Sequence, residues 1–407
     1  MYPLHTLSNG IKVVVIPSVS AHVCHCGLLI NAGSRDEKDD EYGLAHFVEH
    51  TIFKGTDKRS AYHILSRLDE VGGELNAYTT KEETAVHASF LPQYLERAAS
   101  LISDMVFCSV FPEKEIERER EVIIDEITSY LDTPSETIFD ELEERIFANS
   151  PLGHNILGSI DSVRSFSRAD AERFCRRCHL TNQMAFVVWG HVDENRVLRI
   201  AEKYFGCRQQ SSAIAKRTPV NSFNTFTDCR QQDTHQAHVV LGFLTPSAHD
   251  DARLSVSVLN NLLGGPCMNS RLSIALRERS GIAYNVETSY STFDDTGLLT
   301  IYFGTDQRNI NRSLSIVKKE INRLASRELS PAQLSNVLRQ YTGQLLMSAD
   351  SGESIMLSVA RSAIVYNSAP SVEEICQHVQ SEVTAKSLLS AAQTWLATDN
   401  FAQLIYV

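Results

Sequence analysis

The stretch Gly43-Leu-Ala-His-Phe-Val-Glu-His-Thr-Ile-Phe-Lys-Gly55 contains two histidines that are four residues apart. An α-helix has about 3.6 residues per turn, so His46 and His50 lie one turn apart on one face, with Glu49 beside them. The spacing predicts a helix that runs from about Gly43 to Lys54 and ends at Gly55. Two imidazoles can bind one metal ion, and the adjacent carboxylate can then act as a general base on a water molecule at the metal.

A pattern this short can arise by chance, so a helix with two surface histidines is the alternative interpretation. A third ligand is expected in the acidic helix that begins at Pro112, most of whose charges are typical of a solvated face. Glu119 and Glu126 are seven residues apart and share a face with Ile116 and Ile123. Both carboxylates are therefore expected to point toward the apolar interior, where a carboxylate is costly unless it is paired or binds a metal.

The composition limits the class of protein. At roughly 150 residues per domain, 407 residues predict two or three domains. A net charge of -12, from 38 basic and 50 acidic side chains, disfavours a nucleic-acid partner. No run approaches the ~18 apolar residues of a membrane helix, and the N-terminus does not have the pattern of a signal peptide. Because nine irregularly spaced cysteines are typical of reduced thiols, we expect a cytoplasmic protein with no membrane partner.

The two halves of the chain resemble each other. Residues 208–235 contain few large apolar side chains and predict a linker between an N-terminal domain, 1–207, and a C-terminal domain, 236–407. Each half contains a buried strand, a helix that ends in glycine, a hairpin, and a long helix that begins at a proline. The predicted fold class is α+β, with two structurally similar domains, each a largely antiparallel mixed sheet with helices packed on one face.

The repeat also compares the two halves position by position. Matching Gly55 with Gly265, and Pro112 with Pro331, places mostly apolar residues of the second half opposite the five ionisable residues of the first. These residues of the second half are Val256, Leu259, Asn260, Leu338 and Leu345. The C-terminal domain is therefore predicted to lack metal ligands, and the scaffold does not need the ionisable residues for packing.

Several spaced motifs together resemble the pitrilysin/insulinase family of zinc metallopeptidases. The similarity is greatest to the short two-domain branch that includes bacterial peptidases and the β subunit of the mitochondrial processing peptidase. In chain order the motifs are His46-Phe47-Val48-Glu49-His50, Phe53-Lys54-Gly55-Thr56, Gly72-Gly73-Glu74-Leu75-Asn76-Ala77-Tyr78-Thr79, Glu117-Arg118-Glu119-Arg120 with Glu126, Gly153-His154 with Leu157-Gly158, and Ser270-Arg271-Leu272 with Arg277 and Gly281-Ile282-Ala283-Tyr284.

The resemblance implies a role for each residue of the first half. It implies His46, His50 and Glu126 as ligands of Zn²⁺, and Glu49 as the base that takes a proton from the zinc-bound water. It implies Glu119 as a second carboxylate that supports the site by holding a histidine ring.

The resemblance also implies residues that bind the substrate. Arg277 and Tyr284 match an arginine and tyrosine pair that approaches the substrate from the facing domain. Asn76 and Ala77 match the edge strand to which the substrate backbone adds as an extra β-strand.

The expected function is a zinc-dependent endopeptidase that hydrolyses peptides or unfolded segments in a closed dimeric chamber. A homodimer is expected because family members of this length form only half of such a chamber. The alternative is a non-catalytic structural or assembly subunit that retains the family fold. Loss of any of the five site residues would favour that alternative, and all five are present.

Overall fold

A computed structural model describes residues 1–211, 217–232, 234–397 and 400–407. The chain forms two compact units, and each contains segments from both halves of the sequence. The first unit consists of Met1–Thr128, His154–Thr218 and Met347–Glu374; the second consists of Ser129–Gly153, Pro219–Leu346 and Ile375–Val407. Residues 212–216 and 233 of the predicted linker lie outside the described residues. The linear domain boundaries stay a prediction.

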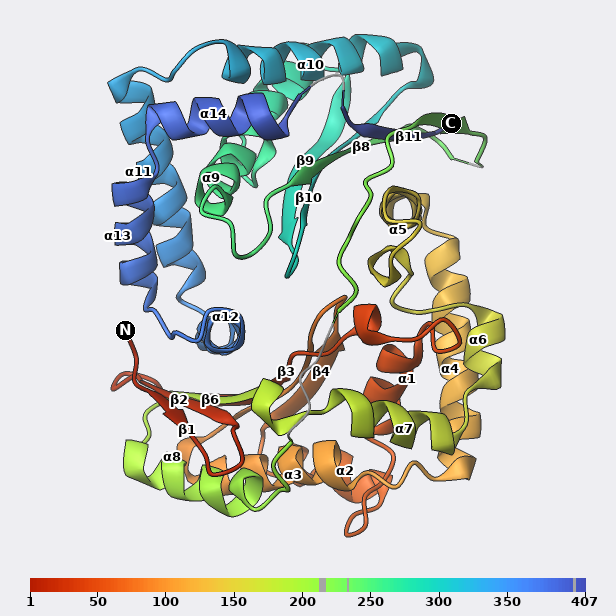
Figure 1. Cartoon of the computed structure of the whole chain (residues 1–407), viewed down its shortest axis with the longest axis vertical. Coiled ribbons are helices and arrows are strands. Elements are labelled where there is room, and N and C mark those ends of the chain that lie inside the picture. Colours follow the sequence, from red (N-terminus) through yellow and green to blue (C-terminus); the bar gives the residue numbers. More distant parts are fainter. Residues whose placement is uncertain (212–216, 233, 398–399) are drawn as a thin grey trace. The chain divides into compact units, whose positions relative to one another are not determined.

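The first unit contains a six-stranded sheet in the order β1-β2-β6-β3-β5-β4 (Figure 1). Its strands are β1 (Leu4–Thr6), β2 (Lys12–Pro17), β3 (Cys24–Ile30), β4 (Glu74–Thr79), β5 (Thr84–Phe90) and β6 (Met184–Gly190). All neighbours are antiparallel except β2 and β6, which are parallel. The sheet ends at β4, so one edge of the hairpin β4–β5 is open among the described residues.

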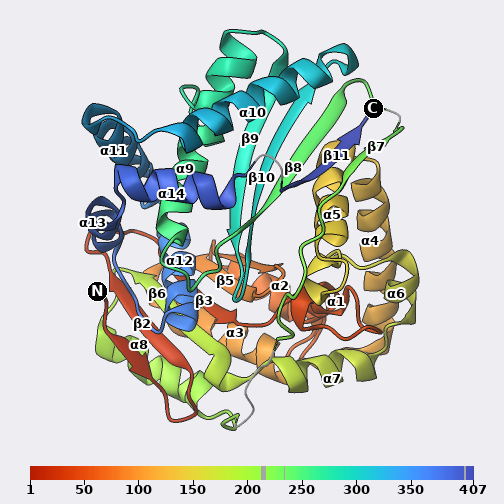
Figure 2. The ribbon, with the colours of Figure 1, turned by 45° about the horizontal axis from the view of Figure 1, so that its top comes forward.

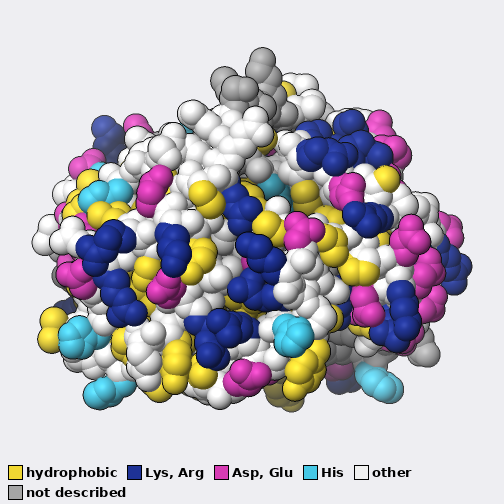
Figure 3. All heavy atoms as spheres, turned by 90° about the horizontal axis from the view of Figure 1, so that it is seen from below, with side chains coloured by type: hydrophobic (Ala, Val, Ile, Leu, Met, Phe, Trp, Pro, Cys, Tyr) yellow, Lys and Arg dark blue, Asp and Glu magenta, His cyan; other side chains and the backbone are white. Residues whose placement is uncertain are grey.

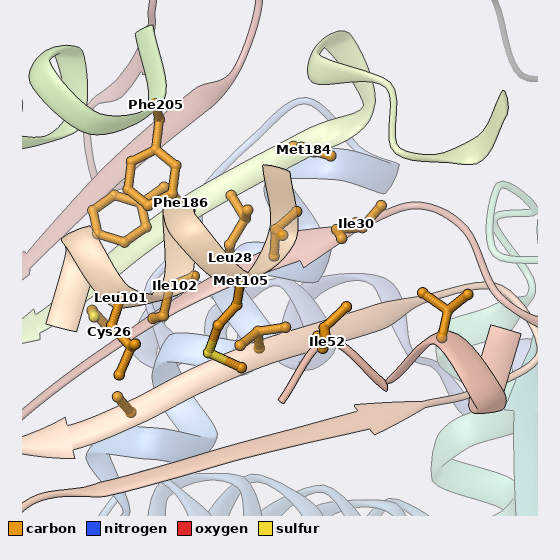
Figure 4. Close-up of a cluster of buried hydrophobic side chains, with 14 of the residues drawn as sticks. Cys26, Leu28, Ile30, Ile52, Leu101, Ile102, Met105, Met184, Phe186 and Phe205 are labelled. Carbon is orange, nitrogen blue, oxygen red and sulfur yellow. The ribbon is translucent and has the colours of Figure 1, made fainter. Parts of the chain in front are cut away.

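Helices cover one face of this sheet and form the larger core with it. They are α1 (Leu44–Thr51), α2 (Ala61–Asp69), α3 (Leu95–Cys108), α4 (Glu113–Leu131), α6 (Ile160–Ser165), α7 (Arg168–Cys178) and α8 (Glu194–Ala201). Figure 4 shows Leu28 and Ile30 of β3 and Phe186 of β6 beside Leu101 and Met105 of α3. All five side chains are fully buried, so α3 fixes the helical layer to the central strands.

The opposite face of the same sheet is covered by α12 (Gly352–Val365), which comes from the C-terminal half of the sequence. Val14, Leu29 and Val187 on the strands pack against Met356 and Ala360 of this helix. The prediction of helices on one face is therefore incomplete. Adjacent residues of the central strands are buried on both faces, and such a sheet needs a cover on each side.

Met356→Ala is expected to lower the free energy of unfolding by about 3 kcal/mol, because truncation of a buried methionine leaves a cavity under the sheet. Met356 is fully buried, whereas Met347 is 77% exposed. The matched control Met347→Ala is therefore expected to change the free energy of unfolding by less than about 0.5 kcal/mol. Urea unfolding of the two variants measures the difference. Equal free energies of unfolding for the two variants would contradict the burial of Met356 under the sheet.

The second unit contains a five-stranded sheet in the order β7-β11-β8-β10-β9. Its strands are β7 (Thr227–Arg230), β8 (Ala237–Thr245), β9 (Ala283–Thr292), β10 (Gly297–Thr305) and β11 (Ala402–Tyr406). One face packs against α9 (Arg253–Gly264), α10 (Ile310–Ser326) and α14 (Ala385–Trp395), and the other against α5 (Pro134–Ile146) (Figure 2). The remaining helices are α11 (Pro331–Ser348) and α13 (Val372–Glu382). Strand β7 lies inside the predicted linker, where it pairs with β11 in parallel.

The two sheets share one topology. The order β2-β6-β3-β5-β4 has the same parallel and antiparallel pairings as β7-β11-β8-β10-β9. The α+β class with two similar domains is therefore confirmed. The two halves of the sequence also exchange one helix each. Helix α5, from the first half, covers a face of the second sheet, and α12, from the second half, covers a face of the first sheet. Among the helices in the described part, none is both long enough and apolar enough to cross a bilayer.

Candidate metal centre

The helix that carries both histidines has a defined start. Gly43 precedes α1 with a φ of 95°, a left-handed conformation that favours glycine. The buried carboxylate of Glu37 accepts hydrogen bonds from the backbone N–H of Gly43 at 3.0 Å and of Ala45 at 2.7 Å. These bonds satisfy amides that have no partner within the helix. The helix is shorter than the predicted range, 43–54, but both histidines lie within it.

The apolar side of α1 packs into the core and holds the histidines at the edge of the sheet layer. Phe47 and Val48 are buried, and His46 is only 8% exposed. The rings of His46 and His50 lie 4.6 Å apart between centroids. Burial, together with the neighbouring His50, lowers the pKa of His46 to about 3. His46 is therefore neutral at pH 7, which is the form of imidazole that binds a metal.

Helix α4 brings a carboxylate to the two imidazoles. Ile116 and Ile123 are buried and fix this face of α4 on the core. Glu126 Oε2 lies 3.5 Å from His50 Nε2 and 3.9 Å from His46 Nε2. One donor atom from each of the three residues lies within 4.8 Å of the other two, and no other such group of His, Cys, Asp or Glu occurs in the described part of the chain.

Glu119, also on α4, contacts one of the two histidines. Glu119 Oε2 lies 3.2 Å from His50 Nδ1, and Glu119 Oε1 lies 2.7 Å from Nζ of Lys54. Burial differs from the prediction: the side chain of Glu119 is 9% exposed, but that of Glu126 is 45% exposed and does not point into the apolar interior. The prediction was wrong for Glu126 because the residues around it lie at the boundary of the core.

Lys54 was not predicted as a site residue. It offsets the charge of Glu119, which is buried and would otherwise be costly. Its position four residues after His50 was the signal in the sequence that could have indicated it.

Glu49 lies beside the cluster but is not one of its three donors. Burial raises the pKa of the Glu49 carboxyl, and Glu126 raises it further, whereas Thr79 and His50 act in the opposite direction. A carboxylate with a raised pKa is a stronger base than an exposed one. Glu49 can therefore accept a proton next to the three donor atoms.

The strand β4 lies at the edge of the sheet, as predicted for Asn76 and Ala77. Ala77 packs against the core on the same side of the strand as Thr79, whereas Asn76 is exposed. The open edge offers backbone N–H and C=O groups to an extended peptide. Binding of substrate there stays a prediction.

Arg277 and Tyr284 belong to the second unit, and their approach to a substrate stays a prediction. Arg277 lies in the π-helical turn Ser273–Glu278, with its Nε 3.5 Å from Glu278 Oε1. Tyr284 is near the start of β9, and 86% of it is exposed.

The corresponding positions of the second half have packing roles. Val256 and Leu259 are buried in the core of α9, and Leu338 packs against that core. Asn260 Nδ2 donates to the Thr288 carbonyl at 3.5 Å. The ionisable cluster therefore belongs to the first unit alone among these matched positions.

The donor set of the first unit fits a zinc ion. Two imidazole nitrogens and one carboxylate oxygen converge, which is a ligand combination that catalytic zinc sites use. The contact of Glu119 with His50 Nδ1 leaves His50 Nε2 facing Glu126 and fixes the orientation of the ring. Nδ1 of His46 is buried without a hydrogen-bond partner among the described residues, so packing orients that ring.

Family models match most of the chain. The model described as "Insulinase (Peptidase family M16)" matches residues 12–159, and the model described as "Peptidase M16 inactive domain" matches residues 165–341. The chain is 30% identical over 382 residues to an "uncharacterized zinc protease", YmxG, of Bacillus subtilis, covering 94% of this chain and 92% of that protein. It is also 30% identical over 387 residues to an "uncharacterized zinc protease" of Streptomyces coelicolor, covering 92% of this chain and 83% of that protein.

Solved structures have the same fold. A protease from Helicobacter pylori superimposes with a TM-score of 0.91 at 18% identity, covering 100% of this chain and 99% of that chain. A structure described as a peptidase M16 inactive domain, from Pseudomonas fluorescens, superimposes with a TM-score of 0.92 at 18% identity, covering 100% of this chain and 98% of that chain. From the match of both family models and the 30% identity to relatives over nearly its whole length, the chain belongs to the insulinase family, peptidase family M16.

Proposed function

We propose that this protein is a zinc-dependent endopeptidase that hydrolyses peptides or unfolded segments. The observation that carries the proposal is the convergence of His46, His50 and Glu126, with Glu49 beside them, in a chain of a peptidase family. The two relatives quoted above are named zinc proteases, which supports zinc as the metal.

In the proposed reaction His46, His50 and Glu126 hold the zinc ion. When bound, zinc polarises a peptide carbonyl and lowers the pKa of a water toward about 7. Glu49 takes a proton from the attacking water and returns it to the leaving amine, and its raised pKa supports this role. Glu119 holds the ring of His50 through Nδ1.

The open edge of β4 supports an extended peptide as the substrate. Asn76 and Ala77 lie on this strand, and α1 packs against it, so a peptide paired with β4 would run past the helix that carries the histidines. Arg277 and Tyr284 are proposed to contact the substrate from the second unit.

Cleavage of an internally quenched peptide library tests the proposal. We expect hydrolysis that 1,10-phenanthroline abolishes and that added Zn²⁺ restores, with internal cleavage sites identified by mass spectrometry. A protein that binds zinc but cleaves no peptide would instead support the alternative, a non-catalytic structural or assembly subunit. Cleavage that the chelator does not affect would contradict the role of the metal.

We also propose that the protein works as a homodimer in which two chains enclose the substrate. Support comes from the resemblance to short family members, each of which forms half of a chamber. Light scattering at the concentration of the activity assay is expected to give twice the mass of the 45.5 kDa chain. A monomeric mass together with full activity would contradict the closed dimeric chamber.

Lys54→Met is expected to weaken zinc binding by about 10- to 100-fold, because Glu119 loses its ammonium partner and no longer holds His50 in one orientation. Competition with a chromophoric chelator measures the affinity without recourse to activity. The control Lys58→Met removes the same charge from an exposed position nearby, and Lys54→Arg is expected to recover most of the loss. Equal affinities for Lys54→Met and Lys58→Met would show that Lys54 does not position the site.

A further inference from the structure

The second unit contains a pocket of about 340 Å³ whose charged lining is mainly arginine. It lies between the π-helical turn Ser273–Glu278, helix α10 and the start of α11, the last two of which Figure 2 shows. Its charged lining residues are Arg271, Arg279, Arg323, Arg327, Glu320 and Glu328. All of them belong to the second unit, so the pocket shares no residue with the candidate metal centre.

The arginines of this pocket are only partly neutralised. Arg323 Nη1 pairs with the buried Glu320 at 2.6 Å. For Arg271, Arg279 and Arg327 the structure records no ion pair or hydrogen bond of the side chain to another described residue. With four positive and two negative side chains, the lining has an excess of positive charge although the whole chain carries -12.

Arg271 is affected by two like charges and one opposite charge of the lining. Burial lowers the pKa of Arg271 from its ordinary value; Glu320 opposes this change, and Arg323 and Arg327 add to it. A guanidinium stays charged in a protein even so, and its repulsion from two neighbours therefore costs free energy in the empty pocket. A bound anion would offset that repulsion, because it attracts each guanidinium.

Two arginines of the first unit, Arg59 and Arg97, differ in this respect. Figure 3 shows lysine and arginine side chains, interspersed with acidic ones, on the face that carries α2, α3 and α8. There Arg59 pairs with Asp104, and Arg97 lies 3.9 Å from Glu70 and donates to the Arg67 carbonyl. Arg59 and Arg97 thus have partners within the protein, whereas three arginines of the pocket do not.

We propose that the pocket formed by Arg271, Arg279, Arg323 and Arg327 is a binding site for a small phosphate-bearing anion. The planar guanidinium group forms paired hydrogen bonds with phosphate oxygens, and several such groups around one cavity match an anion that carries more than one charge. The volume of the pocket lies at the lower end of the range for small-molecule sites. A pocket of this size is too small for a nucleic acid or a folded partner. The ligand class is inorganic phosphate, pyrophosphate or the phosphoryl groups of a nucleotide.

Isothermal titration of the full chain at constant ionic strength tests the proposal, with inorganic phosphate, pyrophosphate and a nucleoside diphosphate as separate probes and sulfate as the comparison. Saturable binding of at least one phosphate probe is expected. Arg271→Gln and Arg327→Gln are each expected to weaken it by at least about tenfold, because each removes a charge-assisted contact. Arg308→Gln is the matched control: it removes the same charge from an exposed residue of the second unit that does not line the pocket.

The outcomes separate the proposal from nonspecific attraction. Binding that Arg271→Gln and Arg327→Gln lose and Arg308→Gln keeps supports the site, and the tightest probe identifies the source of the phosphoryl group. Equal weakening by all three variants, or the absence of saturable binding, overturns the proposal. Arg279→Gln and Arg327→Gln replace exposed side chains and keep the test decisive if Arg271→Gln does not fold.

Discussion

Glu49→Gln is expected to lower kcat/KM for a quenched peptide by about 1,000-fold while zinc remains bound. Glutamine has nearly the same size as glutamate, but its amide cannot accept a proton from the attacking water. Because Glu49 is not one of the three converging donors, metal content measured by atomic emission is expected to stay at the wild-type level. The pair of measurements thus separates the proton acceptor from the ligands.

Glu121→Gln is the matched control for this prediction, because it makes the same chemical change on the exposed face of α4. It is expected to leave both the rate and the metal content unchanged. Native activity of Glu49→Gln would show that another group accepts the proton. Loss of the metal from Glu49→Gln would show that Glu49 holds the site together instead.

Gly43→Ala is expected to lower the free energy of unfolding by about 4 kcal/mol, the sum of a left-handed backbone and a steric overlap that side-chain rotation cannot relieve. Gly43 has a φ of 95°, and a Cβ atom there would lie 2.7 Å from the Leu157 carbonyl oxygen and 2.8 Å from the Cα of Gly158. The same overlap displaces the start of α1, so zinc affinity is expected to fall together with stability.

Gly72→Ala provides the control for Gly43→Ala. Gly72 also has a positive φ, 71°, but a Cβ atom there would meet nothing within 4 Å. Only the cost of the left-handed backbone remains, so the free energy of unfolding is expected to fall by about 1 kcal/mol, with zinc affinity unchanged. Thermal and urea unfolding of both variants measure the difference. If the two substitutions cost the same, close approach of α1 to Leu157 and Gly158 is not what fixes the helix.

Elements with a local signal in the sequence were predicted well. The hairpin predicted in the first half is β4 with β5, and the one predicted in the second half is β9 with β10. The acidic helix predicted from Pro112 is α4. Alternation of apolar residues, helix-starting prolines and the i, i+4 histidines act over a few residues, so a sequence displays them directly.

Features that depend on contacts between distant segments were not predicted. The contact of Lys54 with Glu119 joins the end of α1 to α4, and Glu37 caps α1 from a preceding turn. The exposure of Glu126 depends on where the core ends, which the seven-residue spacing from Glu119 cannot show. The cover of the first sheet by α12 comes from a segment more than 300 residues beyond β2.

The exchange of α5 and α12 has a consequence for the order in which the chain can fold as the ribosome makes it. The two histidines and the carboxylates Glu119 and Glu126 are synthesised long before α12 (Gly352–Val365). The apolar face of the first sheet therefore stays open to water until α12 has emerged. A nascent chain that ends between the two halves has an uncovered sheet and exposes apolar surface that favours aggregation. The metal-bearing unit is therefore completed only after α12, which follows residues 219–346 of the second unit, has been made. Separately expressed halves are expected to need each other to become compact.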